Sequence, residues 1–175
     1  MFKRISLTMA VVYGLIIIAA IMVLDVLIIL NYKQEQLEKN EARQLIFGDI
    51  IANVVRDKLD DTMELNGILR ESSAKLEGRV LVINPDKKVL ADNYTFYIGK
   101  QLDSDELNRV IESKEQVTAY YRADNQNIMI AAVPILQSKQ LLGVLLISMY
   151  VDPIYQDTRD LAKQVVAISA LAGVF

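Results

Sequence analysis

The 175-residue chain contains no cysteine, no histidine and no tryptophan, and only three prolines. Without cysteine it can form no disulfide, no thiolate nucleophile and no Cys-ligated metal site. Without histidine it lacks the commonest general base and metal ligand of proteins. No complete catalytic triad can be assembled from what remains. The residues therefore predict no catalytic site, no metal site and no cofactor in this chain.

Charge and composition exclude two further classes of protein. Lysine and arginine total 19 against 22 acidic residues, a net charge of −3, and 53% of the residues are hydrophobic. A nucleic-acid-binding domain carries a strong basic excess, and a disordered chain has few apolar residues. We therefore expect a folded protein that does not bind nucleic acid.

The first 30 residues predict a membrane helix. No charged side chain occurs from Ile5 to Leu24, and about 20 apolar residues span a bilayer core of roughly 30 Å. This run is too long for a cleaved signal peptide. Because Lys3 and Arg4 precede it, the positive-inside rule places the N-terminus in the cytoplasm and residues 31 to about 163 outside. Asp25, the one charge in the continuing apolar run, either marks the membrane interface or pairs with another helix.

Residues 31–77 predict a long helix that continues from the membrane. Proline is absent, and "NYKQEQLEKNEARQ" consists of good helix formers without a stop signal. Apolar residues recur on one face of this helix, at Phe47, Ile51, Val54, Val55 and Leu59. The face either packs on the following domain or forms a parallel dimer seam.

Residues 78–152 predict an α+β domain with a sheet of about five antiparallel strands. A turn at residues 84–87 joins two short apolar strands, and Asp103 is placed to cap a short helix that has Glu106 three residues later. A second hairpin follows, over residues 116–135. The last strand, residues 141–150, is apolar at nearly every position and should lie in the middle of the sheet.

Residues 153–175 predict a connecting helix and the start of a second membrane helix. Asp152 is placed as N-cap and Pro153 as the first helical residue, so that the last strand leads directly into this helix. Apolar residues from Val165 to Phe175 supply about half of a membrane span. We expect the chain to be the N-terminal part of a longer protein.

Several motifs of the outer segment resemble the extracytoplasmic PAS-like, or Cache-type, sensor of bacterial membrane-bound histidine kinases, including the WalK/YycG kind. They are Asp86 in the first turn, Val89 to Ala91 in the returning strand, Gly99 to Leu102 before the short helix, and Pro134, Ile135 and Gly143 to Leu145 in the last hairpin. The resemblance covers roughly residues 78–175, and its motifs are turn and packing signatures.

This resemblance implies a homodimer in the bacterial cell membrane whose outer domain responds to a small molecule or an envelope protein. The output would be a cytoplasmic kinase, with its ATP and Mg²⁺, acting on a response regulator. Those parts are missing here, since a phosphoacceptor histidine cannot occur in a chain without histidine. The same input half could serve a chemoreceptor or a cyclic-dinucleotide enzyme, and a membrane scaffold without an output domain is a further alternative.

Four residues are candidates for ligand binding: Asp92, Tyr97, Tyr121 and Arg122. Strand alternation places Tyr121 on one face with Val117, and Arg122 on the other, which makes Tyr121 the better pocket residue. Core packing is the alternative role for the aromatic side chains. Asp152 and Pro153 are the candidates for coupling the domain to the membrane helix.

Overall fold

The structure is a computed structural model that describes residues 2–76 and 78–172. The chain divides into two compact units. One unit consists of the chain up to Glu38 together with the chain from Pro153 onward. The other unit is Lys39–Asp152. The second unit contains the sheet and every hollow considered below.

The N-terminal helix α1 runs from Phe2 to Val55 without interruption. Of the described helices, α1 alone contains a stretch that is long and apolar enough to cross a membrane, judged by length and composition. The side chains of that stretch are largely exposed, as lipid-facing side chains would be. Asp25 lies within it and is half-buried, and its role at an interface or between helices stays a prediction.

The prediction of one helix through residue 77 is wrong. A short 3-10 turn, η1 (Arg56–Lys58), follows α1, and a separate helix, α2, covers Thr62–Leu76. The carboxylate of Asp61 accepts hydrogen bonds from the backbone N–H groups of Met63 and Glu64, both at 3.0 Å. Asp61 therefore caps a new helix, and this local N-terminal signal overrides the helix-forming composition around it.

Helix α4 covers Asp152–Ala172, where a connecting helix and the start of a second membrane helix are predicted. Within the unit that it shares with the first part of α1, the ammonium of Lys33 lies 4.5 Å from the ring centroid of Tyr155. Thr158 is buried and donates to the carbonyl of Ile154. Residues 173–175, the last of the predicted half-span, lie outside the described residues.

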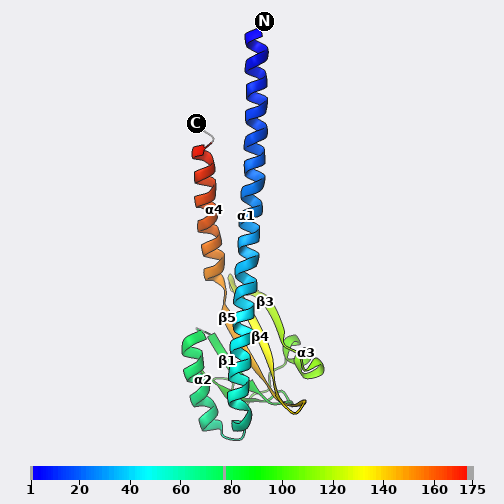
Figure 1. The fold of residues 1–175 in the computed structure, drawn as a ribbon. Coiled ribbons are helices and arrows are strands. Elements are labelled where there is room, and N and C mark those ends of the chain that lie inside the picture. The colour runs from blue at the N-terminus through cyan, green and yellow to red at the C-terminus, as the bar shows by residue number, and fades with distance from the viewer. Residues whose placement is uncertain (1, 77, 173–175) are drawn as a thin grey trace. The chain divides into compact units, whose positions relative to one another are not determined.

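Five antiparallel strands form one sheet, as the sequence predicts (Figure 1). The strands are β1 (Gly78–Ile83), β2 (Val89–Asp92), β3 (Val117–Ala123), β4 (Gln126–Gln137) and β5 (Gln140–Tyr150). Their order is β2-β1-β5-β4-β3, so the apolar strand β5 is central, as predicted. The β3–β4 turn (Asp124 and Asn125) and the β4–β5 turn (Ser138 and Lys139) each have two residues with positive φ. This is the backbone conformation that a tight two-residue hairpin turn requires.

One face of the sheet packs against α1 and α2. Gly48 of α1 lies so close to the sheet that a Cβ built on it would be 2.7 Å from Cγ2 of Val133. Farther along the helix, Ile51 and Val55 are buried, whereas Val54 is 51% exposed. The apolar face predicted for this helix therefore belongs partly to the core and partly to the surface.

The other face of the sheet is covered by helix α3, which runs from Asp105 to Ser113 (Figure 1). Leu107 and Val110 of α3 join the strand residues of a buried cluster, among them Leu81, Ile83, Val144 and Leu146. This cluster closes the middle of that face.

Asp103 does not cap α3, so that prediction is wrong by one residue. Ser104 has extended backbone, and its hydroxyl accepts from the N–H of Leu107 at 3.3 Å. Asp103 instead accepts from Nζ of Lys87 at 2.8 Å, because the β1–β2 turn brings this lysine beside it. Glu106 turns inward and is buried.

Candidate ligand site

The structure does not bring the four predicted ligand residues into one cluster. Asp92 ends β2 and Tyr97 lies in the loop that follows, whereas Tyr121 and Arg122 belong to β3. Strands β2 and β3 are opposite edges of the sheet, with three strands between them. Arg122 is exposed and reaches only its neighbouring turn, where a guanidinium nitrogen lies 3.5 Å from Oδ1 of Asn125.

Asp92 is the centre of a buried polar group. Its side chain is fully buried and accepts four hydrogen bonds: from Nε and Nη2 of Arg79, at 3.2 and 2.8 Å, and from the backbone N–H groups of Tyr94 and Tyr97, at 3.0 and 2.9 Å. Both carboxylate oxygens are therefore saturated. The sequence reasoning missed Arg79, although the predicted hairpin register places it beside the residues that follow β2.

Burial alone would raise the pKa of Asp92, because it penalises the charged carboxylate. The hydrogen bonds from Arg79 and from the amides of Tyr97 and Tyr94, together with the charge of Arg79, outweigh this effect and hold the pKa of Asp92 below its ordinary value. Asp92 is therefore ionised at neutral pH and forms a fixed ion pair with Arg79.

Aromatic rings surround the cationic side of this ion pair. The guanidinium of Arg79 lies 4.3 Å from the ring centroid of Tyr97 and 5.6 Å from that of Tyr94. The ammonium of Lys100 lies 3.9 Å from the ring centroid of Phe96. Cation–π contacts of this kind fix both partners. The guanidinium is thus held at its edge by Asp92 and over its face by Tyr97.

A hollow of about 380 Å³ opens beside Arg79, on the face of the sheet that α3 covers. Arg79 lies opposite Ser148 across the β1–β5 pair, and Ile128 lies opposite Tyr150 across the β4–β5 pair. Alternation along β5 puts Ser148 and Tyr150 on the same face as the buried Leu146. The lining residues are Gly78, Arg79, Tyr94, Ile128, Ser148, Met149 and Tyr150. The sequence reasoning missed this hollow, because β5 is apolar at nearly every position and the sequence does not show which part of the strand α3 covers.

Tyr121 lies next to the hollow but has another partner. It is the cross-strand neighbour of Ile128, and its hydroxyl donates a hydrogen bond to the buried carboxylate of Glu106 on α3. This hydrogen bond and partial burial raise the pKa of Tyr121 above its ordinary value. The phenol therefore stays protonated and joins β3 to α3.

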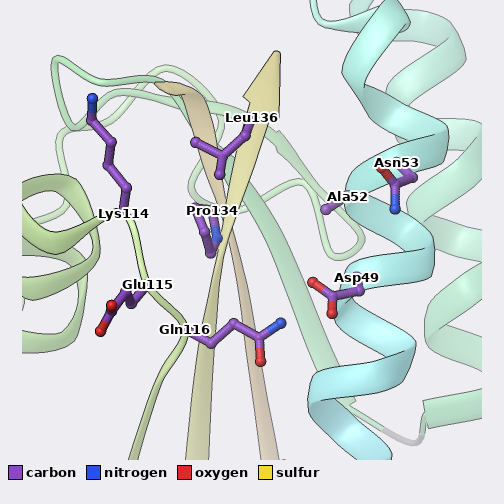
Figure 2. A pocket seen from close by; sticks show the side chains of 8 residues that line it. All are labelled: Asp49, Ala52, Asn53, Lys114, Glu115, Gln116, Pro134 and Leu136. Carbon is purple, nitrogen blue, oxygen red and sulfur yellow. The ribbon is translucent and has the colours of Figure 1, made fainter. Parts of the chain in front are cut away.

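A second hollow, of about 460 Å³, lies at the edge of the sheet, between α1, the loop before β3 and the end of β4 (Figure 2). Strand β3 begins opposite Ala132, so β4 has no neighbour on that side beyond this residue. Pro134, which has no N–H to offer, lines the hollow there, a common way to protect a sheet edge. Lys114 points away from α1 and donates to the carbonyl of Lys139. These features indicate a protected edge.

The described residues contain no group of three or more side chains that could hold a metal ion.

The two predicted coupling residues begin α4. Asp152 is its first residue, and the carboxylate accepts from the backbone N–H of Asn127 at 3.2 Å and from its Nδ2 at 2.9 Å. The N–H of Val151 donates to the carbonyl of Asn127 at 2.9 Å. The sequence predicts Asp152 as the N-cap of α4. In the structure its carboxylate is hydrogen-bonded to Asn127 at the start of β4. Pro153 follows Asp152 in the helix and is exposed.

Comparisons with known proteins agree with this architecture. Residues 64–148, just under half of the chain, match the family model described as the WalK sensor protein kinase Cache domain. No curated protein sequence matches significantly. Among solved structures, the sensor domain of the Vibrio cholerae histidine kinase DctB is similar with a TM-score of 0.59 and 15% identity, over 75% of this chain and 55% of that one.

Two further structures show the same fold. The Escherichia coli DcuS sensor domain has a TM-score of 0.54 at 13% identity, over 67% of this chain and 96% of that one. The sensory domain of the Campylobacter jejuni chemoreceptor Tlp3, with isoleucine bound, has a TM-score of 0.55 at 14% identity, over 77% of this chain and 60% of that one. Residues 64–148 thus match the model of a Cache sensor domain, and the chain shares its fold with sensor domains of histidine kinases and of a chemoreceptor.

Proposed function

We propose that the chain is the extracytoplasmic input region of a membrane-bound histidine kinase. The kinase, with its ATP and Mg²⁺, lies in a part of the protein beyond these residues and phosphorylates a response regulator. One observation carries this proposal: β5 contributes to the hollow and continues without a loop into α4, the helix predicted to enter the membrane. A chemoreceptor output is the alternative, since Tlp3 has a similar sensory domain.

The contact between Asn127 and Asp152 supports a route for the signal. Ile128 and Tyr150 line the hollow. Asn127, next to Ile128, bonds both to Val151, next to Tyr150, and to Asp152, one residue farther along. A ligand that favours one spacing of these strand ends over another would therefore change how Val151 and Asp152 hold the start of α4. Only a few kcal/mol of differential binding are needed to move such a two-state equilibrium.

A second copy of the chain is the proposed partner of α1. Ile46, Ile50 and Val54 recur every four residues and are 62%, 54% and 51% exposed. They form an apolar face on the same continuous helix as the membrane stretch. Two copies anchored by that stretch have parallel helices, so identical faces can meet in register. We therefore propose a parallel homodimer through this face.

A chimera tests the receptor proposal. Residues 1–175 are fused to the cytoplasmic portion of a characterised histidine kinase, and autophosphorylation is measured in membrane vesicles. Asp152→Ala should change basal phosphorylation several-fold, because Asn127 then loses the carboxylate that fixes the start of α4. Asp157→Ala, a change at an exposed position of the same helix, is the matched control. If both variants match the unsubstituted chimera, coupling through Asp152 is wrong.

A further inference from the structure

We infer that the hollow beside Arg79 binds a small monocarboxylate with an apolar body and without an ammonium group. The inference rests on the proposed sensor function and names the class of its ligand. It follows from the free donors of Arg79, from the charge balance of the lining and from the apolar residues opposite.

Arg79 has donors left for a ligand. A guanidinium carries five N–H groups. The hydrogen bonds to Asp92 use the one on Nε and one on Nη2. Asp92 already accepts four hydrogen bonds, so its carboxylate cannot accept the remaining N–H groups of Arg79 as well. The side chain of Arg79 remains 28% exposed and lines the hollow.

The guanidinium is also preorganised. Asp92 fixes its edge, and the ring of Tyr97 lies 4.3 Å from it. An arginine held in this way presents its remaining N–H groups in a fixed plane, which suits the planar, bidentate acceptor of a carboxylate. Ser148, its cross-strand neighbour on the same face, adds a hydroxyl that can donate to the same group.

Charge limits the ligand to one carboxylate. Asp92 already balances the charge of Arg79, and among the residues that the structure describes no other lining side chain is cationic. The described lining residues include no acidic side chain either, and the carboxylate of Asp92 is fully buried. An ammonium group would therefore have no carboxylate to pair with. This distinguishes a 2-oxo acid or a simple carboxylic acid from the corresponding amino acid.

The remainder of the hollow suits a short hydrocarbon chain. Ile128 lies opposite Tyr150, and Tyr94 contributes a further ring. A volume of about 380 Å³ is near the lower end of small-molecule sites, which run from about 300 to 1,000 Å³. A branched acid of about six carbon atoms, with its carboxylate at Arg79, fits this size and polarity.

The test uses the whole chain in detergent and four probes: 4-methyl-2-oxopentanoate, 4-methylpentanoate, 4-methylpentanamide and L-leucine. Affinity is measured by titration calorimetry and by the rise in unfolding temperature, which follows ligand binding to the folded state. The two acids should bind. The amide and L-leucine should each bind at least tenfold more weakly, because the neutral amide cannot accept charge-assisted, bidentate hydrogen bonds from Arg79 and the ammonium of leucine has no partner.

Two variants keep the test independent of folding. Arg79→Lys can destabilise the domain through Asp92, so Ser148→Ala is the main variant. Loss of one hydrogen bond should weaken binding of the acids about five- to tenfold. Ser72→Ala, on α2 and away from the hollow, should leave binding unchanged.

Three outcomes would overturn the inference: no binding of either acid up to about 10 mM, equal binding of the amide, or tighter binding of L-leucine than of its 2-oxo analogue. None of them bears on the Asp152→Ala result with the chimera, which is measured without ligand. Conversely, if the acids bind but Asp152→Ala leaves the phosphorylation of the chimera unchanged, the domain binds this class of ligand and the proposed coupling through Asp152 is wrong.

Discussion

Replacing Gly48 by alanine tests how closely α1 packs on the sheet. A Cβ at this position would lie 2.7 Å from Cγ2 of Val133 and 3.4 Å from Cδ1 of Ile147. Carbon atoms in contact prefer about 3.5 to 4.0 Å, so helix and strand must separate by about 1 Å at this point. Val133 is fully buried and has little freedom to turn aside.

The expected cost combines two opposing effects. Overpacking a core costs about 1 to 3 kcal/mol, whereas alanine in a helix interior is favoured over glycine by about 1 kcal/mol. Gly48→Ala should therefore be neutral to about 2 kcal/mol destabilising. Gly67 of α2 has nothing within 4 Å of the equivalent Cβ position, so Gly67→Ala should gain about 1 kcal/mol.

The assay is thermal unfolding of the whole chain in detergent, followed by far-UV circular dichroism. One kcal/mol corresponds to a shift of about 2 to 4 °C for a protein of this size. The Gly67→Ala protein should therefore unfold several degrees above the Gly48→Ala protein. An equal gain from both substitutions would refute the close approach of α1 to β4.

Three further predictions concern the core and the dimer. Asp92→Asn should cost about 3 kcal/mol at pH 7, because it leaves Arg79 without its charged partner. Since the pKa of Asp92 is lowered in the folded state, the stabilisation from Asp92 is complete above about pH 4 and is lost as the pH falls through that lowered pKa. Below about pH 4 the unfolding temperature of the variant should therefore vary less with pH than that of the unsubstituted protein. Gly143→Ala should cost more than Gly48→Ala in the same unfolding assay, because its Cβ would lie 2.7 Å from the backbone oxygen of Ile83, which cannot move without disturbing the β1–β5 pairing. Ile50→Cys should form a disulfide-linked dimer on mild oxidation in membranes, whereas Asp49→Cys should not; cross-linking of both to the same extent would contradict the proposed face.

Local signals in the sequence were sufficient for most of the fold. The Pro and Asp of the turn at residues 84–87, and Asp124 with Asn125, favour turns strongly enough to fix both predicted hairpins. The apolar character of β5 placed it in the centre of the sheet. The break after α1 was missed, although Asp61 followed by a helix-forming run is an N-cap signal.

The site was harder to predict, because it depends on contacts between distant residues. Asp92 was identified as a candidate, but its partner Arg79 lies in another strand and reads from the sequence as an ordinary surface charge. Tyr121 was placed on the correct face, yet strand order puts it on the far edge from Asp92. Ser148 and Tyr150 line the hollow only because α3 covers the middle of the sheet and leaves the end of β5 open.

The proposed function requires that residues 64–148 lie outside the cell while the N-terminus stays inside. Because the chain has no cysteine, a single introduced thiol reports its own side of the membrane. Glu112→Cys, at an exposed position of α3, and Lys3→Cys are treated in intact bacterial cells with a membrane-impermeant maleimide. The proposal predicts labelling of Glu112→Cys in intact cells and of Lys3→Cys only after permeabilisation. Labelling of Lys3→Cys alone, or protection of both, would contradict it.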